Sequence, residues 1–230
     1  MRNRTKTVAV TTLLALAISI AHADSVPDNT IRVGVYYVQY HSRADDLSGP
    51  FVPPGLNLHV NDIETLYLAY VRRLSTHFDL ELAAGAPPLT KTEGRGPAML
   101  GSVPYNGQVI STARWFAPTL LLNYKFLDDS HAWRPYIGVG VNYVHFYDRQ
   151  STAAGNAAGG GPTSLKLPDS VGPAATVGMS YRLRDRWSLF ASYSATVVKS
   201  RLTADTAGVL RTSEISFGPR ALVVAAGYSF

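Results

Sequence analysis

Apolar and polar residues alternate along most of the chain, a period that is typical of β-strands with one apolar face. Ile137, Val139, Val141 and Tyr143, for example, alternate with glycine and asparagine. Several of the alternating segments exceed the ~5–6 residues usual for soluble sheets and match the ~9–11 residues that a tilted strand needs to cross a bilayer. The pattern predicts eight strands, at residues 30–40, 62–74, 78–92, 111–126, 133–147, 170–183, 187–203 and 213–230.

The connections between these segments alternate in length. Residues 75–77, 127–132 and 184–186 are short turns. The longer connections are rich in Gly, Pro, Ser, Thr and Asp and lie at residues 41–61, 93–110, 148–169 and 204–212. Short turns on one side and long loops on the other are typical of bacterial outer-membrane barrels, whose long loops lie outside the cell.

A barrel is expected because an open sheet edge would leave unpaired N–H and C=O groups in hydrocarbon. Aromatic residues near the predicted strand ends fit the depth of the lipid headgroups. They are Tyr37, Phe126, Trp133, Tyr143, Tyr147, Tyr181, Trp187, Tyr228 and Phe230. The sequence therefore predicts an all-β fold, an eight-stranded antiparallel transmembrane β-barrel, and the alternative is a soluble sandwich or a lipocalin-like barrel.

The first 23 residues are typical of a secretory signal peptide. Arg2, Arg4 and Lys6 precede an apolar stretch that is too short to span a membrane, and 21–23 fits a small-x-small cleavage site. We expect a cleaved signal peptide at 1–23 and a barrel at 24–230, the alternative being a membrane anchor or a buried helix. The later chain has no run near 18 apolar residues, which excludes a helical membrane protein.

Charge and cysteine content narrow the function classes. Cleavage would remove three of the 21 basic residues and no acidic one, leaving 18 against 16 and a net charge of +2. The remaining basic residues are scattered, so nucleic acid is not expected as a partner. The absence of cysteine excludes a thiol nucleophile and a thiolate metal site.

Four segments resemble one known family. Residues 133–143 resemble the RPY-x-G-x-G-x-NY strand of the OmpW/AlkL outer-membrane proteins, and 117–120 resembles their PPTL segment. Residues 81–87 resemble an E-L-x-A-A-x-P strand, and 226–230 resembles the terminal AGY-x-F. The resemblance implies a narrow eight-stranded barrel with an apolar outer lumen that passes small hydrophobic molecules to the membrane. It also implies that the insertion machinery reads the terminal Phe230. Loops 41–61 and 148–169 show little likeness, so a specificity that resides in loops does not transfer.

The alternation also predicts which side chains enter the lumen. Apolar residues expected inside near the outer end, as a site for a hydrophobic solute, are Tyr36, Val38, Tyr40, Ile63, Leu89, Trp115, Val144, Phe146, Val198 and Phe217. Charged residues expected to form an ion-paired plug at the periplasmic end are Arg32, Arg73, Asp79, Glu81, Lys125, Arg134 and Arg182. Pro87, Pro88 and Pro118 lack the N–H of a closed ladder and predict a lateral opening, or alternatively only strand ends or bulges.

No pattern of catalytic residues stands out. There is no Gly-x-Ser-x-Gly, the histidines lack metal-ligand spacing, and 159–162 is expected to be a flexible loop rather than a phosphate loop. We therefore expect no enzyme, cofactor or metal. The expected partners are outer-membrane lipid and lipopolysaccharide, a small hydrophobic solute and the insertion machinery, with the barrel itself a monomer. A structural or receptor barrel with a packed lumen is the main alternative, and a lipid-modifying enzyme is the weaker one.

Overall fold

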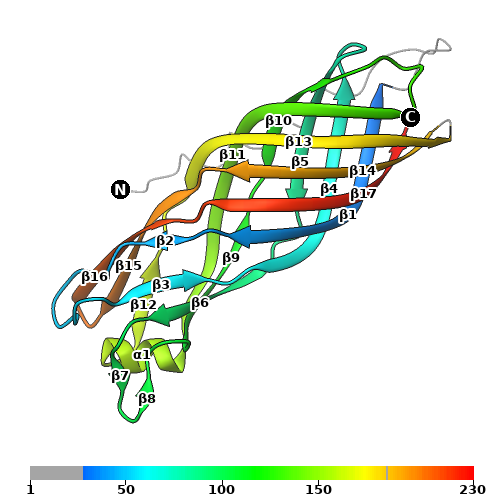
Figure 1. Ribbon diagram of the computed structural model, residues 1–230. Helices are drawn as coiled ribbons and strands as arrows, with labels where there is room; N and C mark the ends of the chain where they lie inside the picture. Colours follow the sequence, from blue (N-terminus) through cyan, green and yellow to red (C-terminus); the bar gives the residue numbers. More distant parts are fainter. Residues whose placement is uncertain (1–27, 185) are drawn as a thin grey trace, which may run out of the picture.

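Eight antiparallel strands close into a barrel in the computed structural model, which describes residues 28–184 and 186–230 (Figure 1). The proposed signal peptide lies outside the described residues. In order around the ring, the strands are β1 (Asn29–Tyr40), β17 (Pro219–Ser229), β14 (Trp187–Thr196), β13 (Ser170–Arg184), β11 (Trp133–Ser151), β10 (Thr119–Lys125), β5 (Phe78–Gly85) and β4 (Ile63–Arg73). Pairing of β10 with both β11 and β5, and of β4 with β1, closes the ring.

The alternation in sequence becomes an alternation between lipid and lumen. Along β1, Val33 and Val35 are 50% and 58% exposed on the outer face, whereas Arg32 and Val38 are 4% and 1% exposed inside. The other barrel strands repeat the pattern, so the outer wall is a band of Val, Leu, Ile and aromatic side chains. Such a band matches the hydrocarbon core of a bilayer.

The barrel continues as two flaps beyond one end, which we call the loop end (Figure 1). One flap extends β11 through β9 (Val109–Phe116), β6 (Leu89–Arg95) and β3 (Asn57–Val60). The other contains β12 (Thr163–Lys166), β15 (Lys199–Thr206), β16 (Val209–Ser216) and β2 (Arg43–Ala44). Helix α1 (Ala153–Gly159) and the small hairpin of β7 (Met99–Leu100) and β8 (Val103–Pro104) lie beside them.

Four predicted strands are interrupted, which corrects the sequence-based boundaries. The breaks lie at residues 86–88, 117–118, 197–198 and 217–218. Three contain or adjoin proline, which cannot donate to a ladder, and the fourth faces Pro173, whose carbonyl accepts from Val197 N–H. Each interruption marks the place where the barrel strands give way to the flaps.

The predicted loops 41–61 and 148–169 are more ordered than expected. They contribute β2, β3, α1 and β12, and their Leu58, Val60 and Leu167 are buried. Thr152 caps α1 at its start and Gly160, at φ 85°, caps its end. The glycine-rich segment is therefore partly a capped helix rather than a flexible loop, because its flanking apolar residues have a core to join.

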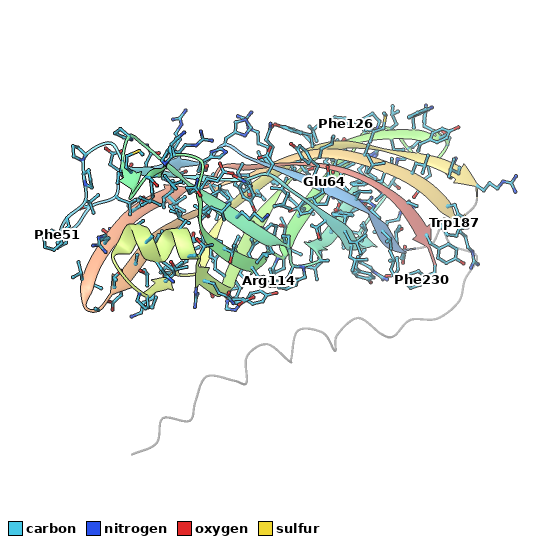
Figure 2. The ribbon with its side chains drawn as sticks, turned by 90° about the horizontal axis from the view of Figure 1, so that it is seen from below. Phe51, Glu64, Arg114, Phe126, Trp187 and Phe230 are labelled. Carbon is cyan, nitrogen blue, oxygen red and sulfur yellow. The ribbon has the colours of Figure 1, made fainter. Side chains whose placement is uncertain are left out.

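The opposite end, which we call the turn end, carries the short turns at 75–77 and 127–132 and an aromatic belt. Trp133 packs on Tyr181 with ring centroids 4.3 Å apart, and Trp187 packs on Tyr228 at 5.1 Å. Figure 2 shows Phe126, Trp187 and Phe230 toward this end, while Phe51 lies at the opposite extreme. Among the described residues, no helix is long and apolar enough to cross a membrane.

Candidate functional site

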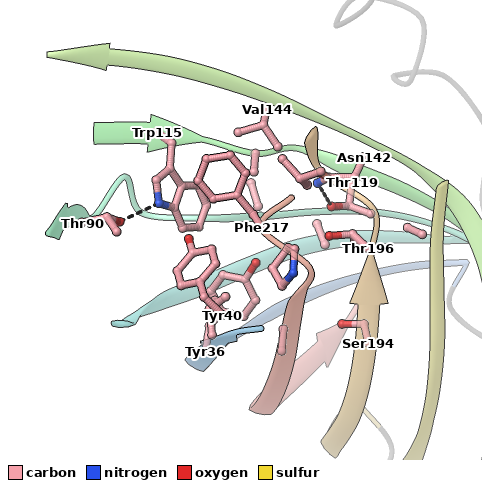
Figure 3. A pocket seen from close by; sticks show the side chains of 18 of the residues that line it. Tyr36, Tyr40, Thr90, Trp115, Thr119, Asn142, Val144, Ser194, Thr196 and Phe217 are labelled. Atoms are coloured by element: carbon pink, nitrogen blue, oxygen red, sulfur yellow. Dashed lines mark hydrogen bonds between the residues drawn. The ribbon is translucent and has the colours of Figure 1, made fainter. Parts of the chain in front are cut away.

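An apolar cavity of about 100 Å³, the lumen cavity, lies inside the barrel toward the loop end (Figure 3). Its wall is lined by Tyr36 and Tyr40 of β1, Trp115 of β9, Val144 of β11 and Phe217, which lies between β16 and β17. Pockets for small apolar ligands have this character, concave and mostly apolar with a few polar groups.

Two pairs of polar side chains that line the lumen cavity are hydrogen-bonded to each other. Trp115 Nε1 donates to Thr90 Oγ1 at 2.9 Å, and Asn142 Nδ2 donates to Thr119 Oγ1 at 2.7 Å. In this state they offer a ligand little hydrogen bonding, so shape and apolar contact dominate. Within the described residues, no three His, Asp or Glu side chains come together in a way that would hold a metal ion.

Eight of the ten residues predicted for the apolar lumen line this cavity, and Ile63 packs against the same apolar cluster. Leu89 does not, which corrects the prediction: it is 44% exposed on the outer face, and Thr90 points inward instead. The inward face is odd-numbered along β5 and even-numbered at Thr90, because the break at 86–88 shifts the alternation by one residue.

Three stacked rings lie toward the turn end of the cavity, and one of them, Tyr67, lines it. Phe190 stacks between Tyr67 and Tyr136, with centroid separations of 6.3 and 5.6 Å. The Arg32 guanidinium lies 3.8 Å from the centroid of the Phe190 ring. Sequence reasoning omitted these rings, although their inward parity could have identified them.

Beside the rings, a buried polar network centres on Glu81, which also lines the lumen cavity. Its carboxylate accepts hydrogen bonds from Arg32 Nη1 at 2.9 Å, Asn123 Nδ2 at 2.7 Å and Tyr67 Oη at 2.5 Å. Asp79 pairs with Lys125 Nζ in the same region. Paired charges of opposite sign thus fill this level of the barrel.

A second tier of charge lies at the turn end and centres on Asp129, which sequence reasoning missed because it lies in a turn. Asp129 pairs with Arg134 Nη1 at 2.6 Å and with Arg73. Arg182 corrects the prediction of a buried plug: it is exposed at the rim, where it donates to the Asp129 backbone carbonyl at 2.8 Å. The alternation along β13 predicts the direction of the Arg182 side chain, but at this residue β13 has already passed the end of the barrel.

The wall is interrupted between strands three and four of the predicted barrel. Ladder pairing stops at Ala83–Thr119 and resumes at Leu89–Arg114. Pro87, Pro88 and Pro118 lie in the two unpaired segments. Ala84 follows the outward parity of β5, yet it lines the lumen cavity, so the cavity reaches the wall at this interruption.

On the other side of strand four, the wall is continuous. Tyr143 N–H donates to the Pro118 carbonyl at 3.0 Å, between the β10 and β9 sections of the β11 ladder. At the interruption itself, Arg114 Nη1 donates to the Pro87 carbonyl at 3.3 Å, and Arg114 Nε lies 3.5 Å from Asp148. A side chain thus spans the place where backbone pairing is missing.

Comparison with known proteins gives concordant results. The profile of the OmpW family matches residues 27–230. Outer membrane protein W of Vibrio cholerae is 29% identical over 97% of both chains. A protein of Pseudomonas aeruginosa named dibenzothiophene metabolism operon protein PahQ is 26% identical, covering 87% of this chain and 88% of its own. The crystal structure of OprG from Pseudomonas aeruginosa superposes with a TM-score of 0.79 at 23% identity, over 89% of this chain and 96% of that one. The structural likeness concerns the fold.

Proposed function

The chain belongs to the OmpW family of outer-membrane proteins, and from this premise we propose that its barrel takes small hydrophobic molecules from outside the cell and releases them sideways into the outer membrane. The observation that carries the proposal is the apolar cavity above a floor of rings and paired charges. An apolar solute has a favourable site in the upper lumen and an unfavourable path through the base.

Weak binding suits a conduit, because a tightly bound solute would not leave. A solute with about 150–250 Å² of apolar surface gains about 4–6 kcal/mol on burial. Association costs about 4 kcal/mol or more, so the net affinity is low. The cavity of about 100 Å³ is also smaller than the roughly 150 Å³ that holds benzene in an engineered core. Entry therefore requires Tyr40 or Phe217 to move.

Lateral release follows from the closed floor. A solute that cannot pass the Arg32–Glu81 level leaves through the wall, and between Ala83–Thr119 and Leu89–Arg114 the ladder lacks the backbone pairs that an opening would otherwise have to break. The name of the relative PahQ links it to an operon for a sulfur-containing aromatic, which fits a hydrophobic cargo.

The alternative function is a structural or receptor barrel whose lumen is simply packed. The small volume of the cavity favours it. The two functions predict different effects of a polar lumen: it abolishes uptake by a conduit, and it leaves uptake unchanged if the barrel has no transport role.

The first experiment makes the lumen polar with Val144→Asp and Phe146→Asp. Both side chains are buried and face the lumen, so the lipid face is unchanged. We expect uptake of n-octane and naphthalene by cells to fall to the level of cells without the protein. Leu210→Asp, an exposed position in the loop-end hairpin, is the matched control. If both lumen variants fold, insert and transport fully, the packed-barrel reading replaces this one.

The second arm tests the exit, using the absence of native cysteine. Continuing the β5–β10 register would place Ala84 opposite Pro118, and Leu82 pairs with Leu120 two residues further toward the turn end. A reducible cross-link through Ala84→Cys and Pro118→Cys is expected to stop uptake until it is reduced. The same cross-link through Leu82→Cys and Leu120→Cys should change nothing. Full uptake through the cross-linked Ala84–Pro118 variant would refute a lateral exit.

A further inference from the structure

A second and larger cavity, the outer cavity, lies among the flaps at the loop end, with a volume of about 350 Å³. Its walls come from the segment before β3, the β7–β8 hairpin, α1, β12 and the β15–β16 hairpin, which converge in Figure 1. Most of the lining is apolar, for example Leu56, Met99, Ile110 and Leu165. The packing is close: Gly155 of α1 lies against the Ile110 carbonyl, where a Cβ would come within 2.0 Å.

The outer cavity is separate from the lumen cavity, and the two share no lining residue. Along β3, Leu58 lines the outer cavity and Val60 the lumen cavity, while Leu165 and Leu167 are divided in the same way. Ile215 is buried in the apolar cluster and lines neither cavity. A partition of packed apolar side chains, Ile215 among them, thus separates the two cavities.

Polar groups of the outer cavity gather at one place. Arg211 Nη1 donates to Thr206 Oγ1 at 3.4 Å, and the Thr206 and Thr163 hydroxyls lie 2.7 Å apart. Arg211 Nε donates to the Pro50 carbonyl at 3.2 Å, which holds the guanidinium in position. Within the described part of the chain, Arg211 has no carboxylate partner, and it is the one residue of a charged type that lines this cavity. Burial raises the pKa of Tyr105, another lining residue, to about 12, so that phenol stays neutral.

From this arrangement we propose that the outer cavity binds an amphiphile with an alkyl tail and a carboxylate head, a fatty acid anion of medium length. The tail occupies the apolar wall formed by Leu56, Met99 and Leu165, and the carboxylate meets Arg211 and the hydroxyl of Thr206. A guanidinium suits a carboxylate because its N–H groups match the two oxygens. Binding of this ligand in the outer cavity does not depend on transport through the lumen. A role of the outer cavity as the first binding site of a transported solute rests on the proposed function.

The charge selects among alkyl ligands rather than supplying most of the affinity. Arg211 is half-buried, so water partly screens the ion pair that it would form with a bound carboxylate. A pair of this kind is worth about 0.2–1 kcal/mol, which corresponds to a preference of up to about fivefold. Octanoate should therefore bind more tightly than octanol by about that factor, and the preference should shrink at high salt.

Methionine methyl groups provide a direct readout. Met99 lines the outer cavity, and Met179 faces lipid on the barrel wall, so the two report on the site and on general partitioning. The experiment titrates the full mature chain in lipid nanodiscs with octanoate and with octanol, following both methyl signals by NMR. We expect Met99 to shift with saturation, more tightly for octanoate, and Met179 to follow only the partitioning of each ligand.

Two variants and a control separate head from tail. Arg211→Gln should make octanoate and octanol bind equally, and Ala204→Trp should fill the cavity and abolish both shifts. Arg201→Gln removes the same charge from the outer side of the same hairpin, where Arg201 pairs with Glu214, and should leave the preference intact. Equal binding of both ligands by the unaltered protein, or a preference that survives Arg211→Gln, would overturn the carboxylate assignment. Failure of Met99 to shift with either ligand overturns the site itself. Because uptake is not measured here, failure of the lumen route would leave these results unchanged.

Discussion

Removing the Glu81 carboxylate is the sharpest test of the closed floor. The side chain is 3% exposed and accepts hydrogen bonds from Arg32, Asn123 and Tyr67. Glu81→Ala leaves the Arg32 guanidinium buried without its anion and two further donors without an acceptor. Breaking a buried pair in this way costs about 3–5 kcal/mol. The Phe190 ring 3.8 Å from Arg32 offsets a part of that cost, by about 0.5–2 kcal/mol.

The assay is equilibrium unfolding by urea of the mature chain in lipid vesicles, followed by tryptophan fluorescence. We expect Glu81→Ala to lower the free energy of unfolding by about 3 kcal/mol. The double variant Arg32→Met and Glu81→Met should recover most of that loss, because replacing both charges with apolar groups of similar size is often neutral. Removing one partner is costly chiefly because the other remains charged and buried.

An exposed ion pair provides the matched control. Arg72 lies 3.6 Å from Asp28 with side chains 39% and 49% exposed, so Asp28→Asn should change the free energy of unfolding by less than about 1 kcal/mol. A loss below about 1 kcal/mol for Glu81→Ala would refute the reasoning. So would a double variant no more stable than the single one, since the cost would then not come from an unpaired charge.

Two further predictions concern the partition and the turn end. Ile215→Ala should join the two cavities and destabilise the protein by about 2–5 kcal/mol. It should also speed the uptake of n-octane by cells relative to the control Ile215→Val, and unchanged uptake would contradict a partition at this residue. The Asp128 carboxyl should titrate near pH 2, because hydrogen bonds from Ser130, and then from His131, lower its pKa to about 2. Its contribution to the turn is then complete above about pH 4 and lost as the pH falls through about 2, and Ser130→Ala should raise the pKa in a carboxyl NMR titration.

The period-two pattern was enough to predict the barrel and the inward face where strands run unbroken. Within β11, residues 134–146 keep one parity, and Val144 and Phe146 lie in the lumen as expected. The β1 residues Tyr36, Val38 and Tyr40 do the same. Alternation is reliable there because hydrogen bonding on both edges fixes the register.

Prediction failed where a break or a chain end changes the geometry. Leu89 follows two prolines, after which the inward face changes from odd-numbered to even-numbered residues. The alternation alone does not reveal how many residues such a break contains, so it cannot predict the face of the residues that follow. Arg182 has the right direction but lies beyond the point where the barrel buries anything. The outer cavity was not predicted at all, because it is built by loops whose apolar residues, such as Leu56 and Met99, show no period.

The break at 86–88 accounts both for the lining of the lumen at Thr90 and for the missing backbone pairs in the wall. Two consecutive prolines cannot donate to a ladder, so β5 must end at Gly85, and the chain resumes at Leu89 with its faces exchanged. The exchange brings Thr90 inside, where it accepts the Trp115 N–H, and turns Leu89 toward lipid. The same prolines therefore have two effects: they remove backbone hydrogen bonds from the wall, and they place Thr90 in the lining of the lumen cavity. A substitution that restored a continuous strand would change the wall and the lining together. A cross-link changes the wall alone, so it tests the exit more cleanly than replacement of Pro87 or Pro88.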